Sequence, residues 1–150
     1  MGQSLVKNYV HIVFCTYRRT PYFFEPWDQE LHAYLGGICN ELKCTPIIIG
    51  GFTEHIHMLV NLSKNISAAK LMEEVKGHSS KWIKSKGVQY RNFAWQSGYA
   101  IFSVNPGRVE NVINYIATQK EHHGLERYED ELRRFLIENE MEYDERYLWD

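Results

Sequence analysis

Three observations predict the fold class of this 150-residue chain. Its periodic segments follow the order strand, helix, strand, strand, helix, strand, which is the split β-α-β pattern of ferredoxin-like α+β folds. Two further helical segments follow this pattern. A length of 150 residues with 44% hydrophobic content suits a single domain. We therefore expect a ferredoxin-like β-α-β-β-α-β antiparallel sheet with helices appended at the C-terminus.

In the first half of the chain, three predicted strands accompany one helix. Residues 6–17 are rich in β-branched and aromatic residues and end at a polar Arg-Arg-Thr-Pro segment, which predicts a strand. Residues 26–43 carry apolar side chains at helical spacing, which predicts a helix despite two glycines in its middle. Residues 45–52 and 56–62 predict two strands, and the glycine pair between them predicts a bulge or turn and hence a hairpin.

The second half of the chain is predicted to be mostly helical. Ser67 is a suitable N-cap for an amphipathic helix over residues 67–86. Residues 93–104 are rich in aromatic residues and predict the fourth strand, which an Asn-Pro-Gly segment ends. Residues 109–123 then predict a third helix ended by a glycine, and residues 128–140 a fourth.

Charge is unevenly distributed along the chain. The formal net charge of −2 by itself argues against a nucleic-acid partner, because proteins that bind nucleic acids usually carry a basic excess. Residues 1–124, however, hold 13 Lys and Arg against 9 Asp and Glu, whereas residues 125–150 hold 4 against 10. Residues 64–91 are the most basic segment. A solvated helix face explains many such runs, so the charge permits a polyanionic partner without requiring one.

Cysteine content and hydropathy indicate the compartment. The three cysteines form no Cys-x-x-Cys pair, so the sequence predicts neither a disulfide framework nor a structural zinc site. A reducing cytoplasm is the simplest location. No apolar run approaches the roughly 18 residues that cross a bilayer, and the N-terminus shows no long apolar signal segment, so we expect no membrane partner.

Two histidines mark the candidate site. His55 and His57 lie two residues apart on a predicted strand, so both imidazoles leave the same face of the sheet, opposite Ile56 and Met58. Neighbouring neutral imidazoles can bind a divalent metal. The alternative is that both are polar residues on the outer face of a half-buried strand.

The third predicted helix offers partners for these histidines. Tyr115, Gln119 and His122 are spaced at i, i+4 and i+7 and therefore share one flank of the helix. A phenol with a pKa near 10 needs a metal or a base to act as a nucleophile, and a glutamine carbonyl can bind a metal without adding charge. The alternative for Tyr115 is an aromatic residue that covers the edge of the core.

These residues resemble the motifs of a known family. His55-Ile56-His57 fits the histidine-hydrophobe-histidine (HUH) motif, and the segment from Asn114 to Gln119 is similar to the single-tyrosine helix of insertion sequence 200/605 type transposases. Further segments resemble other family motifs in the same order along the chain: Tyr9-Val10-His11-Ile12-Val13-Phe14, Val75-Lys76-Gly77-His78-Ser79-Ser80 and Trp95-Gln96-Ser97-Gly98-Tyr99. The chain therefore resembles the single-tyrosine HUH transposases, which include the REP-associated tyrosine transposases.

The resemblance implies an activity and a site. It implies a metal-dependent transposase that cleaves and rejoins single-stranded DNA at hairpin-bearing element ends. His55, His57 and Gln119 would bind one Mg²⁺ or Mn²⁺ ion, and Tyr115 would attack the scissile phosphate to leave a 5′-phosphotyrosine and a free 3′-hydroxyl. The cation would lower the cost of charge at the phosphorus, and the covalent intermediate would keep the bond energy for rejoining without ATP.

The resemblance also implies an assembly and a domain layout. Family members are dimers, so we expect a homodimer whose tyrosine helix can act in trans on the partner's histidines. Residues 1–124 would form the HUH single-tyrosine transposase domain, and residues 125–150 an acidic helical C-terminal extension of the same domain. A cytoplasmic, nucleoid-associated protein is expected.

Several residues have open roles. Glu54 stands where an aspartate often precedes the first histidine, and it could either orient that histidine or bind the metal. His78, His122 and His123 are similarly open. Residues expected to contact DNA phosphates or unpaired bases are Arg18, Lys76, Lys81, Lys84, Arg91, Trp95 and Tyr99. For Trp95, the alternative is a place in the core.

Two other functions compete with transposition. One is a catalytically idle or domesticated DNA-binding regulator of repeated palindromes that kept the fold. The presence of all four residues to which the resemblance assigns the chemistry, His55, His57, Gln119 and Tyr115, favours catalysis instead. The other is a metal-dependent phosphodiesterase that releases its product by hydrolysis and therefore does not need Tyr115.

Overall fold

The fold is built on one four-stranded antiparallel sheet. The structure is a computed structural model that describes residues 2–122 and 124–150. The sheet order is β2-β3-β1-β4, and each neighbouring pair is antiparallel. This is the order of a ferredoxin-like sheet, which confirms the predicted fold class. The strands are β1 (Tyr9–Cys15), β2 (Thr45–Gly51), β3 (His55–Asn61) and β4 (Ala100–Ser103).

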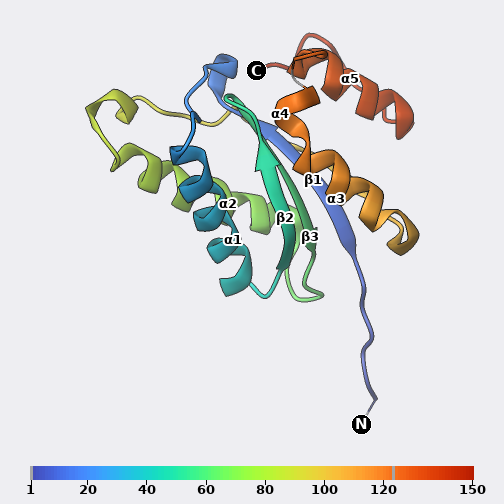
Figure 1. The fold of residues 1–150 in the computed structure, drawn as a ribbon. Helices are drawn as coiled ribbons and strands as arrows, with labels where there is room; N and C mark the ends of the chain where they lie inside the picture. The colour runs from blue at the N-terminus through green and yellow to red at the C-terminus, as the bar shows by residue number, and fades with distance from the viewer. Residues whose placement is uncertain (1, 123) are drawn as a thin grey trace.

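Helices cover both faces of the sheet. Figure 1 shows α1 and α2 on one face and α3, α4 and α5 on the other. The helices are α1 (Trp27–Glu41), α2 (Ala68–Lys84), α3 (Val109–Ala117), α4 (Gln119–His122) and α5 (Tyr128–Glu138). Short 3₁₀ turns complete the described elements: η1 (Tyr17–Arg19), η2 (Val88–Tyr90) and η3 (Pro106–Arg108). Within the described residues, none of the helices combines the length and apolar character that a membrane span requires.

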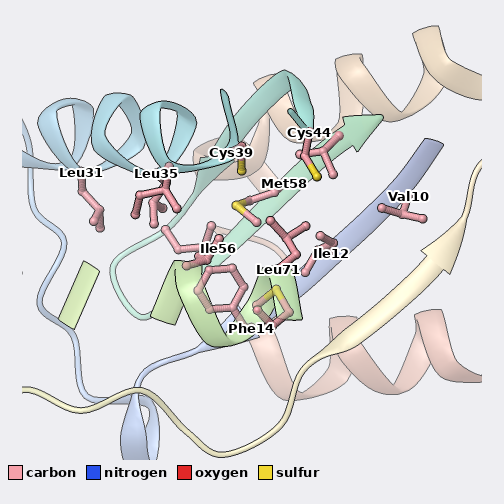
Figure 2. Close-up of a cluster of buried hydrophobic side chains, with 14 of the residues drawn as sticks. Val10, Ile12, Phe14, Leu31, Leu35, Cys39, Cys44, Ile56, Met58 and Leu71 are labelled. Carbon is pink, nitrogen blue, oxygen red and sulfur yellow. The ribbon is translucent and has the colours of Figure 1, made fainter. Parts of the chain in front are cut away.

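The larger core lies between the sheet and helices α1 and α2 (Figure 2). Alternate residues of β1 and β3, including Ile12, Phe14, Ile56 and Met58, point to this side and are buried. Side chains such as Leu35 from the helices fill the space against them. The remaining residues of both strands must therefore face α3 and α5.

A second core lies on that opposite face. Val13 and Cys15 of β1 and Phe102 of β4 form a cluster with Tyr128, Leu132 and Leu136, one stripe of α5. Helix α3 approaches the sheet closely at β2, where a Cβ atom on Gly50 would lie 2.9 Å from Cγ2 of Ile116. Glycine at this position therefore lets the helix that carries Tyr115 pack against the strand beside His57.

The predicted fourth strand is only partly right. The sheet contains Ala100–Ser103, and the preceding residues make a single bridge between Trp95 and Thr16. Gly98 has a φ of 85°, and the Lys76 ammonium donates to the carbonyls of Gln96 and Gly98. These carbonyls are held by a side chain of α2 instead of a neighbouring strand, so residues 93–99 form a loop, from which Phe93 and Trp95 pack into the core.

The predicted third helix is broken into two. Helix α3 ends at Ala117, and Thr118 has φ −108° and ψ 22° before α4 begins. The Thr118 hydroxyl donates to the Asn114 carbonyl at 2.9 Å, a local bond that competes with regular helix geometry. The predicted last residue of this helix, His123, lies outside the described residues.

Other predicted boundaries agree with the structure within a few residues. The strand predicted over residues 6–17 spans Tyr9–Cys15, and the two strands of the predicted hairpin pair antiparallel. Ser67 caps α2, since its side chain accepts from the backbone N–H of Lys70 at 3.0 Å. The last predicted helix ends at Glu138 instead of residue 140.

A buried histidine and tyrosine site

The two histidines of β3 lie on the sheet face covered by α3 and α5. His55 and His57 are both 0% exposed, and their ring centroids are 5.1 Å apart. Strand alternation sends both imidazoles to this face, while Ile56 and Met58 enter the larger core on the other. They are thus fully enclosed polar groups rather than residues on a solvated strand face.

Glu54 orients His55. Its Oε1 atom lies 2.6 Å from Nδ1 of His55, and its Oε2 atom accepts from the Thr53 hydroxyl at 2.8 Å. An ionised carboxylate can only accept, so Nδ1 of a neutral His55 carries the proton and Nε2 presents its lone pair to the interior of the site. Of the two roles left open for Glu54, its placement in the structure corresponds to orienting the imidazole.

His11 orients His57 in the same manner. The Nε2 atom of His11, in β1, lies 2.8 Å from Nδ1 of His57, and the two rings are stacked. Burial and the neighbouring His57 lower the pKa of His11 to about 3, so His11 is neutral at physiological pH and can accept through Nε2. In the tautomer in which Nδ1 of His57 donates to His11, the Nε2 lone pair of His57 also points into the site, as a metal ligand requires.

Gln119 and Glu131 meet these two nitrogen atoms. Oε1 of Gln119 lies 3.1 Å from Nε2 of His55. Oε1 of Glu131 lies 3.1 Å from Nε2 of His57 and 3.4 Å from Nε2 of His55. The Gln119 amide is fixed in this orientation because its Nε2 donates to Oε2 of Glu131 at 3.1 Å. An amide oxygen and a carboxylate oxygen therefore face the Nε2 atoms of the two imidazoles.

Such a set of acceptors fits a divalent cation. One atom each of His55, His57 and Glu131 lie within 4.8 Å of one another, and all three residues are buried. Octahedral ligands at about 2.1 Å from Mg²⁺ are about 3 Å apart along each edge, which is close to the 3.1 Å and 3.4 Å separations in this site. Carboxylate and amide oxygens suit Mg²⁺ and Mn²⁺, and imidazole is a common ligand of divalent transition metals, so the mixed set is compatible with a divalent cation.

Tyr115 lies directly beside this donor set. Its hydroxyl donates to Oε2 of Glu131, and it accepts from Nη2 of Arg134 at 2.9 Å. Its ring centroid is 5.9 Å from that of His57. Burial, followed by the Glu131 carboxylate, raises the pKa of the Tyr115 phenol above its ordinary value. The phenol is therefore neutral in this arrangement and is not by itself an activated nucleophile.

The break between α3 and α4 preserves the predicted flank. The ring centroids of Tyr115 and His122 are 4.6 Å apart, and the Thr118 hydroxyl lies 3.1 Å from Nε2 of His122. Tyr115 and Gln119 both contact Glu131. Two of the three residues predicted to share one helix flank, Tyr115 and Gln119, thus converge on the same carboxylate, although two short helices carry them.

Four residues of the site were not predicted as site residues: His11, Tyr128, Glu131 and Arg134. A signal existed for two of them. His11 is a polar residue on the strand face that also carries Val13, and Glu131 lies three residues after Tyr128 and so shares the buried face of α5. Tyr128 stacks on His55 with centroids 4.4 Å apart. No periodicity argument could assign the α5 side chains to the histidines, because that contact depends on how the chain enters α5.

The residues predicted to contact DNA lie on several elements of the fold. Lys81 and Lys84 are exposed on α2, on the far side of the sheet from the histidines, and Arg91 is exposed in the loop after η2. Arg18 is exposed in η1, with a φ of 57°. Tyr99 is 42% exposed near the edge strand β4.

Two other predicted DNA contacts have internal partners. Trp95 packs on Phe14 with centroids 4.8 Å apart, and its Nε1 donates to the Ser79 hydroxyl at 3.0 Å. The Lys76 ammonium binds backbone carbonyls of the loop before β4, and burial lowers its pKa. Both side chains hold this loop against α2.

Comparison with known proteins identifies related folds. A family model described as "Transposase IS200 like" matches residues 4–119. The structure of a candidate transposase from Deinococcus radiodurans R1 is similar, with a TM-score of 0.61, 17% sequence identity, and coverage of 79% of this chain and 96% of that chain. A REP-associated tyrosine transposase bound to a REP hairpin is also similar, with a TM-score of 0.61, 14% identity, and coverage of 83% and 73% respectively. No curated protein matches the sequence.

Proposed function

Because the chain belongs to the IS200-like transposase family, as the sequence motifs predicted, we propose that it cleaves and rejoins single-stranded DNA through a 5′-phosphotyrosine intermediate. One observation carries the proposal. The Tyr115 hydroxyl and Nε2 of His57 contact the two oxygens of one carboxylate, that of Glu131. A nucleophile and a metal donor set that can share one small anion can also share one phosphate group.

Separate side chains would bind the metal and orient its ligands. His55, His57 and Gln119 would hold one Mg²⁺ or Mn²⁺ ion, which when bound polarises a phosphate oxygen and stabilises charge that develops at the phosphorus. Glu54 and His11 keep the two Nε2 atoms directed into the site. Neutral imidazoles and an amide add no charge to a bound ion, so the positive charge of the ion would remain available to the substrate phosphate.

Tyr115 supplies the nucleophile. Its oxygen forms a bond to phosphorus, the bond from phosphorus to the 3′ oxygen breaks, the phenol loses its proton and the 3′ oxygen gains one. The products are a 5′-phosphotyrosine and a free 3′-hydroxyl, and the reverse attack rejoins DNA without an external energy source. Arg134, which donates to the phenol oxygen, fixes the position of Tyr115 before the reaction.

The proposed substrate is single-stranded DNA with a hairpin at the element end. Support comes from the similar structure that is bound to a REP hairpin. A DNA substrate places the action of the protein at the nucleoid. We also propose a homodimer; in the described chain Tyr115 lies beside the histidines of its own subunit, so exchange of the tyrosine helix in trans would require α3 to leave this position.

The alternative, a catalytically idle DNA-binding regulator, is favoured by one observation. His55, His57 and Glu131 are completely buried, and Gln119 is 1% exposed, so a phosphate has no direct access to the donor set in this conformation. A regulator would need only the outer surfaces of the fold. The two functions differ in whether the protein ever becomes covalently attached to DNA.

Incubation of the protein with a single-stranded hairpin DNA and Mn²⁺ tests the proposal. We expect an adduct that resists denaturation, its loss in Tyr115→Phe, and its absence when EDTA removes the metal. Tyr34→Phe is the matched control, because Tyr34 packs on Trp82 on the other side of the sheet and should not affect the adduct. An adduct that survives Tyr115→Phe would exclude this nucleophile, and cleavage without an adduct would favour the hydrolytic phosphodiesterase.

A further inference from the structure

Helix α5 and the tail that follows it close the site. Tyr128 covers His55, Glu131 reaches between the imidazoles, and Phe135 lies beside Tyr115 with ring centroids 5.4 Å apart. All three residues belong to α5, which follows the segment that matches the transposase family model. The residues expected to hold metal and attack DNA come instead from β3, α3 and α4.

The Glu131 carboxylate makes the contacts that a scissile phosphate would need. One of its oxygens faces the metal donors at 3.1 Å from His57 Nε2, and the other accepts from the Tyr115 hydroxyl and from the Gln119 amide at 3.1 Å. A phosphate under attack by Tyr115 must likewise present one oxygen to the metal and its phosphorus to the phenol. Glu131 occupies the position beside the donors and the phenol that this phosphate would need, and two negative charges there would repel each other.

We propose that α5 is a lid whose Glu131 carboxylate occupies the place of the scissile phosphate, so that the hairpin DNA must displace α5 before Tyr115 can react. This inference rests on the proposed strand-transfer function and adds its regulation. A substrate phosphate that reaches the donor set takes over the contacts of Glu131 and releases the phenol from it.

The attachments of α5 suit a lid that can open. One apolar stripe, Tyr128, Leu132 and Leu136, docks it on the sheet. The tail adds a latch, which we define as Leu148 and Trp149. The Leu148 carbonyl accepts from Gln96 at 2.7 Å, and the Trp149 ring centroid lies 5.0 Å from the guanidinium carbon of Arg19 and 5.2 Å from that of Arg133. No backbone strand pairing between α5 and the sheet has to break for the helix to leave.

The lid predicts two effects of opposite sign for Glu131→Ala. Without DNA, Mn²⁺ should bind the variant more weakly than the wild type, because a carboxylate ligand is missing. With hairpin DNA, adduct formation should be faster by about tenfold or more, because the closed state no longer competes with the substrate. A catalytic role for Glu131 would instead lower both quantities. Asp130→Ala is the matched control, since Asp130 is an exposed acidic residue of the same helix that pairs with Arg133.

The experiment combines three measurements on the full-length chain. Mn²⁺ affinity is measured by calorimetry, adduct formation by a single-turnover assay, and opening of α5 by hydrogen exchange of residues 128–138 with and without hairpin DNA and Mn²⁺. We expect DNA to accelerate exchange in α5 of the wild type. Trp149→Ala, which weakens the latch and keeps Glu131, should also accelerate both hydrogen exchange in α5 and adduct formation. This variant tests the lid if Glu131→Ala does not fold.

The outcomes separate the lid from the function. Unchanged or slower exchange in α5 when DNA is bound, or loss of the adduct in a folded Glu131→Ala variant, would overturn the lid even if the wild type forms adducts. Faster exchange in α5 on DNA binding with no adduct in any variant would support the lid and contradict the strand-transfer chemistry. Failure of hairpin DNA to bind either the wild type or Glu131→Ala would overturn the lid.

Discussion

At the scale of single residues, the site depends on which nitrogen of each imidazole carries a proton. Glu54 and His11 each bind one Nδ1 atom, and both Nε2 atoms then face Gln119 and Glu131. The metal affinity of the site should therefore depend on residues that never touch the metal. Of these two orienting residues, His11 gives the clearer test, because it lies in a different strand from His57, the histidine that it orients.

His11→Phe should weaken Mn²⁺ binding by about 10- to 100-fold, because His57 loses the acceptor that fixes its tautomer and ring orientation. Phenylalanine fills the space of the imidazole and keeps the stacking on His57, so the fold should persist. Calorimetric titration with Mn²⁺ measures the change. His78→Phe is the control, since His78 is exposed on α2 and pairs with Glu74; equal affinities of wild type and His11→Phe would show that His11 does not orient a ligand.

At the scale of elements, the sequence predicts best where periodicity is strong. The segments of β1, β3, α1 and α2 have clear strand or helix patterns, and their predicted positions are right within a few residues. The loop before β4 was predicted as strand because its aromatic residues favour strands, whereas the bonds from Lys76 and the conformation of Gly98 direct the backbone elsewhere. Such bonds between distant segments are not visible in local patterns.

Local patterns likewise predict only part of the candidate site. Both histidines share a face because of strand alternation, and Tyr115 and Gln119 share a flank because of helical spacing, so their proximity could be predicted once the fold was known. The contribution of α5 could not, because the acidic composition of residues 125–150 indicates a solvated helix. Glu131 is instead fully buried, and only its three-dimensional partners explain why an anion is found there.

Cys15 offers a reporter of α5 movement. Its thiol is 1% exposed beneath α5 and donates to Oε1 of Gln96 at 2.5 Å, and burial raises its pKa to about 11. The thiolate is the reactive form, so alkylation at pH 8 should be slow while α5 is docked and should accelerate when hairpin DNA and Mn²⁺ are added. Mass spectrometry of alkylated peptides measures the rate.

Cys39 and Cys44 are internal controls for this experiment, because both are buried in the larger core with α1, on the other side of the sheet. Their alkylation should not respond to DNA. Equal acceleration at all three cysteines would indicate general unfolding instead of movement of α5, and no acceleration at Cys15 would argue that α5 stays docked.

At the scale of the whole molecule, charge and chemistry lie on different faces. The exposed Lys81 and Lys84 are on α2, whereas the histidines lie under α3 and α5. A hairpin that uses both must extend around the edge of the sheet. Residues 125–150 carry the acidic excess and include α5, the helix that covers the histidines, so their net charge disfavours a polyanion at this face.

Lys81→Ala combined with Lys84→Ala should weaken hairpin binding and reduce its dependence on salt, because each lost phosphate contact lowers the slope of log affinity against log salt by about 0.7 to 0.9. The rate of adduct formation at saturating DNA should stay unchanged, since neither lysine lies near Tyr115. Fluorescence anisotropy at several salt concentrations measures the slope. Lys43→Ala removes an exposed charge from the turn after α1 and is the comparison; an identical slope in the double variant and the wild type would place the DNA elsewhere.

The most direct test of the account is to identify the residue that becomes attached to DNA. The adduct formed with hairpin DNA and Mn²⁺ would be digested with protease and nuclease, and the modified peptide sequenced by mass spectrometry. The account predicts a nucleotide joined through its 5′-phosphate to Tyr115, in the peptide that also contains Gln119. Attachment at any other residue, or cleaved DNA with no modified peptide, would contradict it.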